Sequence, residues 1–164
     1  MVRKQFTLCL IVKDNKILLG MKKRGFGEGR WNGFGGKVED GESIVASAAR
    51  ELKEEIGIDV ATQDIHKVGN LEFSFDSEPN KILEVHVYKI SVFVGEPIET
   101  EEMKPEWFAF DKIPYDGMWS DDAHWLPLLL AGKKFIGKFH FDKPSDANYS
   151  AIILSKDLKE VGVV

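Results

Sequence analysis

The sequence has 164 residues, of which 43% are apolar and 30% charged, the size and composition of one globular domain. Its 22 basic and 27 acidic residues give a net charge of −5, which disfavours binding to the phosphate backbone of a nucleic-acid polymer. Cys9 is the only cysteine, which excludes an internal disulfide and favours a reducing compartment. No stretch approaches the roughly 20 apolar residues that span a membrane. We therefore expect a cytoplasmic monomer with one domain over residues 1–164.

Apolar periodicity and turn residues place the predicted elements along the chain. Strand patterns cover residues 6–12 and 16–23, joined by a turn at Asp14 and Asn15. A glycine-rich loop at residues 24–36 precedes a helical pattern over residues 43–56 that ends at Gly57. Further strands are expected at 68–75, 83–94, 107–110, 135–141 and 151–154, and a second helix should run from an N-cap at Ser120 to residue 131. Many strands with two helices predict an α+β fold with a mixed sheet packed between helices.

The first predicted helix carries three glutamates on one face. At about 100° per residue, Glu51, Glu54 and Glu55 fall within roughly 100° of arc, apart from a broad apolar face. Three carboxylates this close repel one another, so a cation should hold them together. Arg50 lies four residues before Glu54, and carboxylate oxygens also suit a hard divalent ion such as Mg²⁺. A solvated acidic helix face is the simpler alternative, because such faces are common.

The spacing around these glutamates decides between the alternatives. Seven identities and two apolar positions are fixed, in the pattern Gly36-x5-Glu42-x7-Arg50-Glu51-Leu52-x-Glu54-Glu55-x-Gly57-Ile58. At average residue frequencies of about 5–7%, chance matches occur on the order of once in 10⁹ positions. The stretch resembles the Nudix box at every defining position. The Nudix family hydrolyses nucleoside diphosphates linked to another group, and its fold is an α/β/α sandwich with a mixed β-sheet.

The resemblance to the Nudix family implies a metal-dependent active site. It implies that Glu51, Glu54 and Glu55 bind Mg²⁺, with Mn²⁺ as a possible substitute, and that Arg50 orients one of them. It also implies that Gly36 lends its carbonyl to the metal and that water attacks a phosphate with help from the metal.

The Nudix box does not identify which residue acts as the general base. Glu55 is one candidate. Glu102, in a loop-like stretch outside the box, corresponds to a second candidate for base and metal ligand in related enzymes. The simpler interpretation of that stretch is an acidic surface run formed by Glu99, Glu101 and Glu102.

Residues outside the box indicate the substrate. Residues 20–27, 29–38 and several short segments up to residue 141 resemble the animal-type enzymes of the family that hydrolyse oxidised purine nucleotides such as 8-oxo-dGTP and 2-hydroxy-dATP. The resemblance implies a pocket in which Asn32, Asp121 and Asp122 hydrogen-bond to the purine. The other residues that it assigns to the substrate are Thr7, Leu8, Lys22, Phe26, Phe73, Met103 and Trp119.

Simpler roles and other functions remain alternatives. Acids in the first turn of a helix, such as Asp121 and Asp122, stabilise its dipole without a ligand, Asn32 suits a turn, and aromatic residues suit a core. The chain departs from the animal enzymes at Ser120, at residues 123–124, in the loop 61–65 and in a longer tail beyond Asp142. Another nucleotide substrate is the competing activity. A binding module without turnover is disfavoured by the intact glutamate set.

Overall fold

The structure, a computed structural model, describes residues 1–145 and 148–164 and builds strands and α-helices from them. The strands are β1 (Val2–Lys13), β2 (Lys16–Lys22), β3 (Trp31–Asn32), β4 (His66–Phe75), β5 (Glu78–Ile90), β6 (Met103–Ala109), β7 (Lys134–Phe141) and β8 (Ile153–Val161). The α-helices are α1 (Ile44–Ile56) and α2 (Asp122–Leu130). Neither helix is long and apolar enough to cross a membrane.

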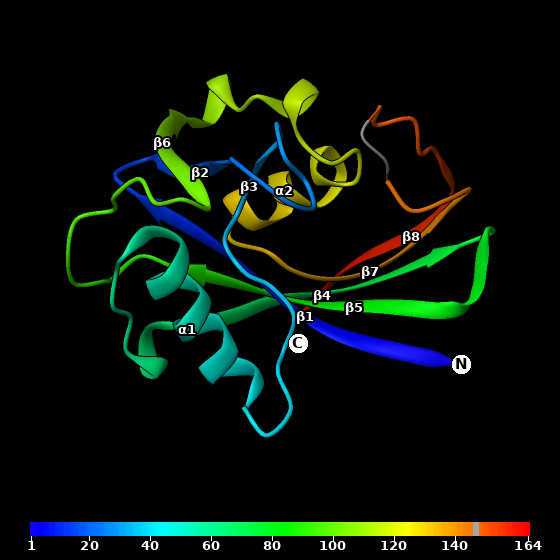
Figure 1. Ribbon diagram of the computed structural model, residues 1–164, viewed down its shortest axis with the longest axis horizontal. Helices are drawn as coiled ribbons and strands as arrows, with labels where there is room; N and C mark the ends of the chain where they lie inside the picture. The colour runs from blue at the N-terminus through cyan, green and yellow to red at the C-terminus, as the bar shows by residue number, and fades with distance from the viewer. Residues whose placement is uncertain (146–147) are drawn as a thin grey trace.

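The strands form one mixed sheet (Figure 1). Its order is β3-β2-β1-β5-β4-β7-β8, and β6 pairs with β2. β1 runs parallel to β5, and β4 runs parallel to β7, whereas the other pairs are antiparallel. The predicted mixed sheet is therefore confirmed.

The two helices cover opposite faces of this sheet, as the alternation of side chains along β1 shows. Cys9 and Ile11 are fully buried in an apolar cluster with the inner face of α1. Leu10, between them, belongs to a second cluster that contains the inner face of α2. Both faces of the central strands are thus buried, and the predicted α/β/α sandwich is confirmed.

Several element boundaries differ from the sequence-based expectation. β5 ends at Ile90 rather than at residue 94, and β8 covers Ile153–Val161 rather than residues 151–154. Most side chains of β8 are charged or polar and exposed, so apolar alternation underestimates its length; its pairing with β7 makes it a strand. The N-cap position of α2 is Asp121, so the prediction of Ser120 as the N-cap was wrong.

Candidate active site

Helix α1 sets the direction of the acidic side chains. It begins after Ser43, whose side chain accepts a hydrogen bond from the Ala46 amide, and it ends at Gly57, whose φ of 74° is the left-handed conformation that glycine adopts readily. Its apolar residues pack against the sheet. The glutamates of the box therefore lie along the rest of the helix surface, where they meet loops from other parts of the chain.

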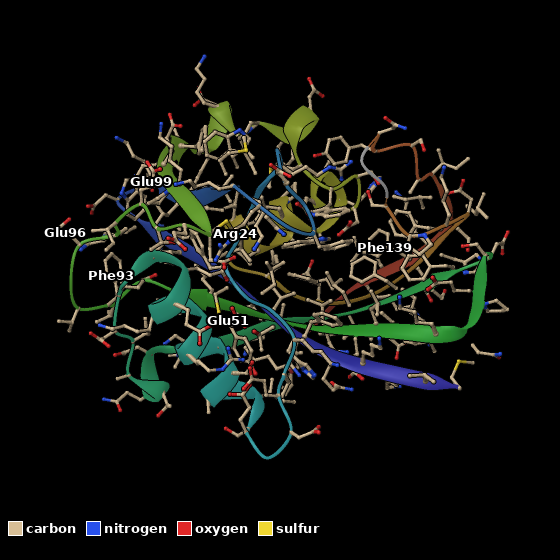
Figure 2. All side chains as sticks on the ribbon, in the orientation of Figure 1. Arg24, Glu51, Phe93, Glu96, Glu99 and Phe139 are labelled. Atoms are coloured by element: carbon tan, nitrogen blue, oxygen red, sulfur yellow. The ribbon has the colours of Figure 1, made fainter. Side chains whose placement is uncertain are left out.

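A cavity of about 500 Å³ beside α1 collects the predicted catalytic carboxylates; we call it the acidic cavity. Glu51, Glu54 and Glu55 reach it from α1, and Glu102 reaches it from the loop before β6. Its other lining residues are Lys22, Arg24, Thr100 and Glu101. Figure 2 shows Glu51 on α1 and Arg24 on the facing loop. The structure thus brings Glu102 to the box, although it lies far from the box in the sequence.

Arg50 links the acidic residues of the box. Its guanidinium lies 2.8 Å from a carboxylate oxygen of Glu42, 3.0 Å from one of Glu51 and 3.1 Å from one of Glu54. Hydrogen bonds from Arg50 lower the pKa of Glu42 to about 2, and the same contacts raise the pKa of Arg50 itself. Arg50 therefore fixes two of the helix glutamates, an arrangement compatible with the orienting role expected of it.

Glu55 is the most deeply buried of the glutamates, with 4% of its surface exposed. One of its carboxylate oxygens accepts a hydrogen bond of 2.8 Å from the Gly35 amide. Burial, with smaller contributions from Glu51 and Glu102, raises the pKa of Glu55 to about 8. The carboxyl therefore needs additional positive charge nearby if it is to be ionised at neutral pH.

Gly36 brings the backbone of the glycine-rich loop against Glu51. A Cβ added at Gly36 would lie only 2.5 Å from Oε1 of Glu51, so a side chain at this position would displace the Glu51 carboxylate. Burial raises the pKa of Glu51 as well. Buried carboxylates beside a tightly packed backbone form the kind of oxygen-rich environment that suits a hard divalent cation.

Glu102 is held by basic side chains across the acidic cavity. Arg24 and Lys22 lie 2.8 Å and 3.1 Å from its carboxylate oxygens, and they lower the pKa of Glu102. Within residues 1–145 and 148–164, no three acidic, histidine or cysteine side chains are grouped as a metal site. The ion pairs account for this, because Arg24 and Lys22 bind Glu102 while Arg50 binds glutamates of α1. The predicted carboxylate ligands thus surround one cavity without converging on one point, and the Gly36 carbonyl accepts a hydrogen bond of 2.9 Å from the Thr7 amide.

A second group of predicted site residues gathers where α2 begins. The Trp119 ring stacks on Phe26, with ring centroids 5.2 Å apart. Cζ of Arg30 lies 4.3 Å from the centroid of the same Trp119 ring, in a cation–π contact. The glycine-rich loop therefore supplies two of the side chains that pack on Trp119.

Asp121 and Asp122, which we call the aspartate pair, are buried at the beginning of α2 with 6% and 2% of their surfaces exposed. Asp121 accepts a hydrogen bond of 2.8 Å from the Trp125 indole. Oδ2 of Asp122 is buried and has no hydrogen-bond partner among the residues described. Burial raises the pKa of both carboxyls, and the charge of Asp121 raises that of Asp122 well above its usual range. Burial thus disfavours ionisation of both carboxyls together, which distinguishes the pair from solvated acids at a helix end.

The remaining predicted pocket residues divide between the two faces of the sheet. Leu8 and Phe73 pack against the apolar cluster under α2. Met103 instead is buried in the cluster under α1. Thr7 lies two residues before Cys9 on β1 and shares its α1-facing side, where the buried hydroxyl finds no partner in the described part of the chain. The structure thus places Leu8 and Phe73 on the side of the aspartate pair and separates Met103 and Thr7 from it.

Asn32 lies half-buried on β3, where its side-chain oxygen accepts a hydrogen bond of 2.9 Å from the Gly33 amide.

Sequence reasoning missed two basic residues of the glycine-rich loop. Arg24 pairs with Glu102, and Arg30 packs on Trp119. Both flank loop glycines in the sequence, but each partner lies more than 70 residues away, as the separation of 78 residues between Arg24 and Glu102 illustrates. Local spacing carries no signal for such contacts.

Comparisons with known proteins agree with this geometry. The NUDIX domain model matches residues 2–129. The chain is 51% identical over 138 residues to the oxidized purine nucleoside triphosphate hydrolase of Danio rerio, and the alignment covers 84% of this chain and 86% of the relative. It is 49% identical over 156 residues to the protein of the same name from Mus musculus, and this alignment covers 95% of this chain and 94% of the relative. The chain therefore belongs to the NUDIX family.

A solved structure shows the same architecture. A mutator MutT protein from Bacillus halodurans superposes with a TM-score of 0.79 at 26% sequence identity, covering 95% of this chain and 97% of that one. The likeness extends over nearly the full length of both chains. It confirms the fold class that the Nudix box implied.

Proposed function

We propose that this NUDIX-family protein hydrolyses oxidised purine nucleoside triphosphates, such as 8-oxo-dGTP and 2-hydroxy-dATP, to the monophosphate and pyrophosphate. The observation that carries the substrate assignment is the buried aspartate pair with an oxygen that lacks a partner among the described residues. Two relatives that share 51% and 49% of aligned residues bear the name of this activity. The acidic cavity supplies the carboxylates for the phosphate chemistry.

The aspartate pair suits the edge of an oxidised purine. A guanine edge offers N1–H and N2–H₂ as donors and O6 as an acceptor. An ionised Asp121 or Asp122 accepts from the donors, while the other carboxyl donates to O6 through the proton that burial retains. Moving this proton between the carboxyls fits the pair to an adenine-type edge, which accounts for both substrates. Trp119 and Phe26 offer aromatic surface for the purine ring.

We assign Mg²⁺ to the acidic cavity, with Mn²⁺ as a substitute. The oxygen donors would be the carboxylates of Glu51, Glu54, Glu55 and Glu102 and the carbonyl of Gly36. When bound, such an ion neutralises phosphate charge and lowers the pKa of water. Burial of the Glu55 carboxyl outweighs the opposing charge of Lys22 and raises the pKa of Glu55 to about 8, so a divalent cation at this place would favour its ionised form.

The side chains of the acidic cavity supply the other functions. Arg50 holds the helix glutamates in position. Lys22 and Arg24 line the same cavity and bind phosphate oxygens, which releases Glu102 from its ion pairs. Glu55 and Glu102 are the two candidates for the group that accepts a proton from the attacking water, and each lies in the cavity where that water must be.

We infer further that the chain acts as a single-domain monomer over residues 1–164 on free nucleotides in the cytoplasm. The net charge of −5 disfavours a nucleic-acid polymer as substrate. The single cysteine, Cys9, is fully buried as a free thiol, which suits a reducing compartment.

Turnover with product identification tests the proposal. In the presence of Mg²⁺ we expect conversion of 8-oxo-dGTP to 8-oxo-dGMP and pyrophosphate, at a higher kcat/KM than for dGTP, a dinucleoside polyphosphate or ADP-ribose. Release of orthophosphate and a diphosphate would place the attack at a different phosphorus atom. Preference for an unoxidised nucleotide would overturn the substrate assignment, and binding without turnover of any nucleotide would overturn the enzymatic one.

A further inference from the structure

Residues 142–145 and 148–152, between β7 and β8, include a contact with the glycine-rich loop; we call them the tail loop, and Figure 1 shows them in orange at the upper right. Its base is closed by Asp142 and Ile152. The Asp142 amide donates to the Ile152 carbonyl over 3.1 Å, and the Asp142 side chain accepts from the Ile152 amide over 2.8 Å. Within the tail loop, Tyr149 donates its hydroxyl hydrogen to the carbonyl of Glu28. The tail loop is thus tied both to the sheet and to the glycine-rich loop.

Arg30 connects this contact to the purine-reading end of the molecule. Its Cζ lies 3.5 Å from the centroid of the Tyr149 ring and 4.3 Å from the centroid of the Trp119 ring. Only 7% of Arg30 is exposed. Burial lowers the pKa of the guanidinium, and Tyr149 and the aspartate pair oppose that shift. An arginine remains charged under these conditions, so a desolvated cation is held beside the aspartate pair.

The backbone of Tyr149 is fixed in an unusual conformation. Its φ of 54° lies in the left-handed region, which costs free energy for any residue other than glycine and persists only where surrounding contacts determine it. The contacts at this position are the Arg30 guanidinium and the Glu28 carbonyl. A cation–π contact is stronger when the cation is desolvated, as Arg30 is.

We propose that Tyr149 is a positioning residue for purine recognition, which acts by holding Arg30 against Trp119. With Arg30 fixed, the Trp119 ring keeps its orientation, and a positive charge stays beside the aspartate pair and favours its singly ionised state. The inference rests on the proposed function, because it assigns the tail loop to the purine pocket of that function. The tail loop therefore affects base recognition and does not affect the chemistry at the acidic cavity.

Steady-state kinetics of two Tyr149 variants test this role. Tyr149→Ala removes the ring from Arg30, and we expect KM for 8-oxo-dGTP to rise about threefold to thirtyfold while kcat stays within about twofold. Tyr149→Phe keeps the ring and should stay within about twofold of wild type in KM. Leu154→Ala, which removes an exposed apolar side chain from the adjoining strand β8, is the matched control and should change neither parameter.

The same experiment separates the inference from the proposed function. The wild-type panel tests the proposed function, and the ratio of Tyr149→Ala to wild type, taken on whichever purine nucleotide the wild type hydrolyses best, tests the tail loop. Equal KM values for Tyr149→Ala and wild type would overturn the inference alone. So would equal falls in kcat for purine and pyrimidine nucleotides together with a lowered melting temperature, since those indicate a purely structural anchor. A wild type that hydrolyses no purine nucleotide would overturn both.

Discussion

In the acidic cavity, three of the four expected metal-binding carboxylates come from adjacent turns of α1, whereas the residues around the aspartate pair come from the glycine-rich loop, α2 and the tail loop. The geometry of the cavity therefore depends chiefly on a helix with a side-chain cap at Ser43 and a glycine at Gly57. The geometry of the aspartate pair depends on tertiary packing. A family can vary the second region while it keeps the first, which is how one box serves different substrates.

The two regions also manage charge differently. In the acidic cavity, Arg50, Arg24 and Lys22 neutralise carboxylates by direct ion pairs. The aspartate pair has a buried cation nearby in Arg30, and burial raises the pKa of both carboxyls, which favours the protonated form. The cavity should consequently respond to divalent ions and phosphates, and the pair should respond to the donors and acceptors of a base. Changes in one region should leave the other largely unaffected.

The largest effect is expected at Glu55. Glu55→Gln keeps an oxygen that can accept the hydrogen bond from the Gly35 amide but removes the ionisable group from the acidic cavity. We expect kcat to fall by roughly 10²–10⁴, the usual scale for losing a group that activates water. At neutral pH the melting temperature without Mg²⁺ should not fall, because burial raises the pKa of Glu55 to about 8 and glutamine matches the neutral form of this side chain.

Kinetics and thermal melting check this expectation against an exposed glutamate. Glu96→Gln, outside the cavity, removes the same charge and should leave kcat within about twofold of wild type. Wild-type turnover by Glu55→Gln would remove Glu55 from the catalytic machinery. A clear loss of stability without Mg²⁺ would assign it a structural role instead.

A smaller and more selective effect is expected at the aspartate pair. Asp121→Asn can still accept from the Trp125 indole but cannot ionise, so a donor on the purine loses its charged partner. A lost charge-assisted hydrogen bond costs about 1.5–3 kcal/mol, or roughly a 10- to 150-fold fall in kcat/KM for 8-oxo-dGTP. Asn32→Ala should be selective in the same direction, if Asn32 also reads the base.

The measurement is kcat/KM of each variant for 8-oxo-dGTP, 2-hydroxy-dATP and dGTP. The three ratios to wild type should differ, because the substrates present different edges to Asp121. Equal losses on all three substrates, or no loss, would return Asp121 to a structural role as the acceptor for Trp125 and leave base selection unexplained.

The sequence predicts a region well when the contacts of that region lie within one element, and poorly when they join distant segments. Helix α1 was predicted with its terminal glycine because the apolar spacing and Gly57 lie within the helix or directly after it. The family and the α/β/α fold were predicted from the box and are confirmed. The roles of the individual site residues stay predictions, although the acidic cavity brings Glu102 to the box as expected.

The failures concern contacts between distant segments. The predicted length of β8 was too short, because its charged, exposed side chains give no apolar alternation and form a strand through pairing with β7. The burial of Met103 in the cluster under α1 likewise depends on packing between distant segments, and its role in the purine pocket stays a prediction. The contact between Arg30 and Tyr149 joins two loops that have no local signal for each other. Sequence spacing therefore predicted helix α1 better than it predicted contacts between distant segments.

The last effect concerns the pH dependence of stability without divalent ions. Burial raises the pKa of Glu55 to about 8, so the folded protein binds this proton more tightly than the unfolded chain, whose glutamates titrate near 4.3. The stabilisation is fully present below the unfolded pKa and is lost as the pH rises through the folded pKa. Glu42 has the opposite sign, because its pKa is lowered to about 2, but its window lies below about pH 4.5.

Comparing wild type with Glu55→Gln isolates this contribution. Other groups, such as His86 with a pKa lowered chiefly by burial, act equally in both proteins and cancel in the difference. Between about pH 5 and pH 8 we expect the free energy of unfolding of wild type to fall relative to the variant by about 3–4 kcal/mol, or roughly 6–16 °C in melting temperature. Thermal melts in chelator at several pH values measure it. If the difference in free energy of unfolding between wild type and Glu55→Gln stays constant with pH, Glu55 has an ordinary carboxyl pKa. The argument that its burial favours a bound cation would then fail.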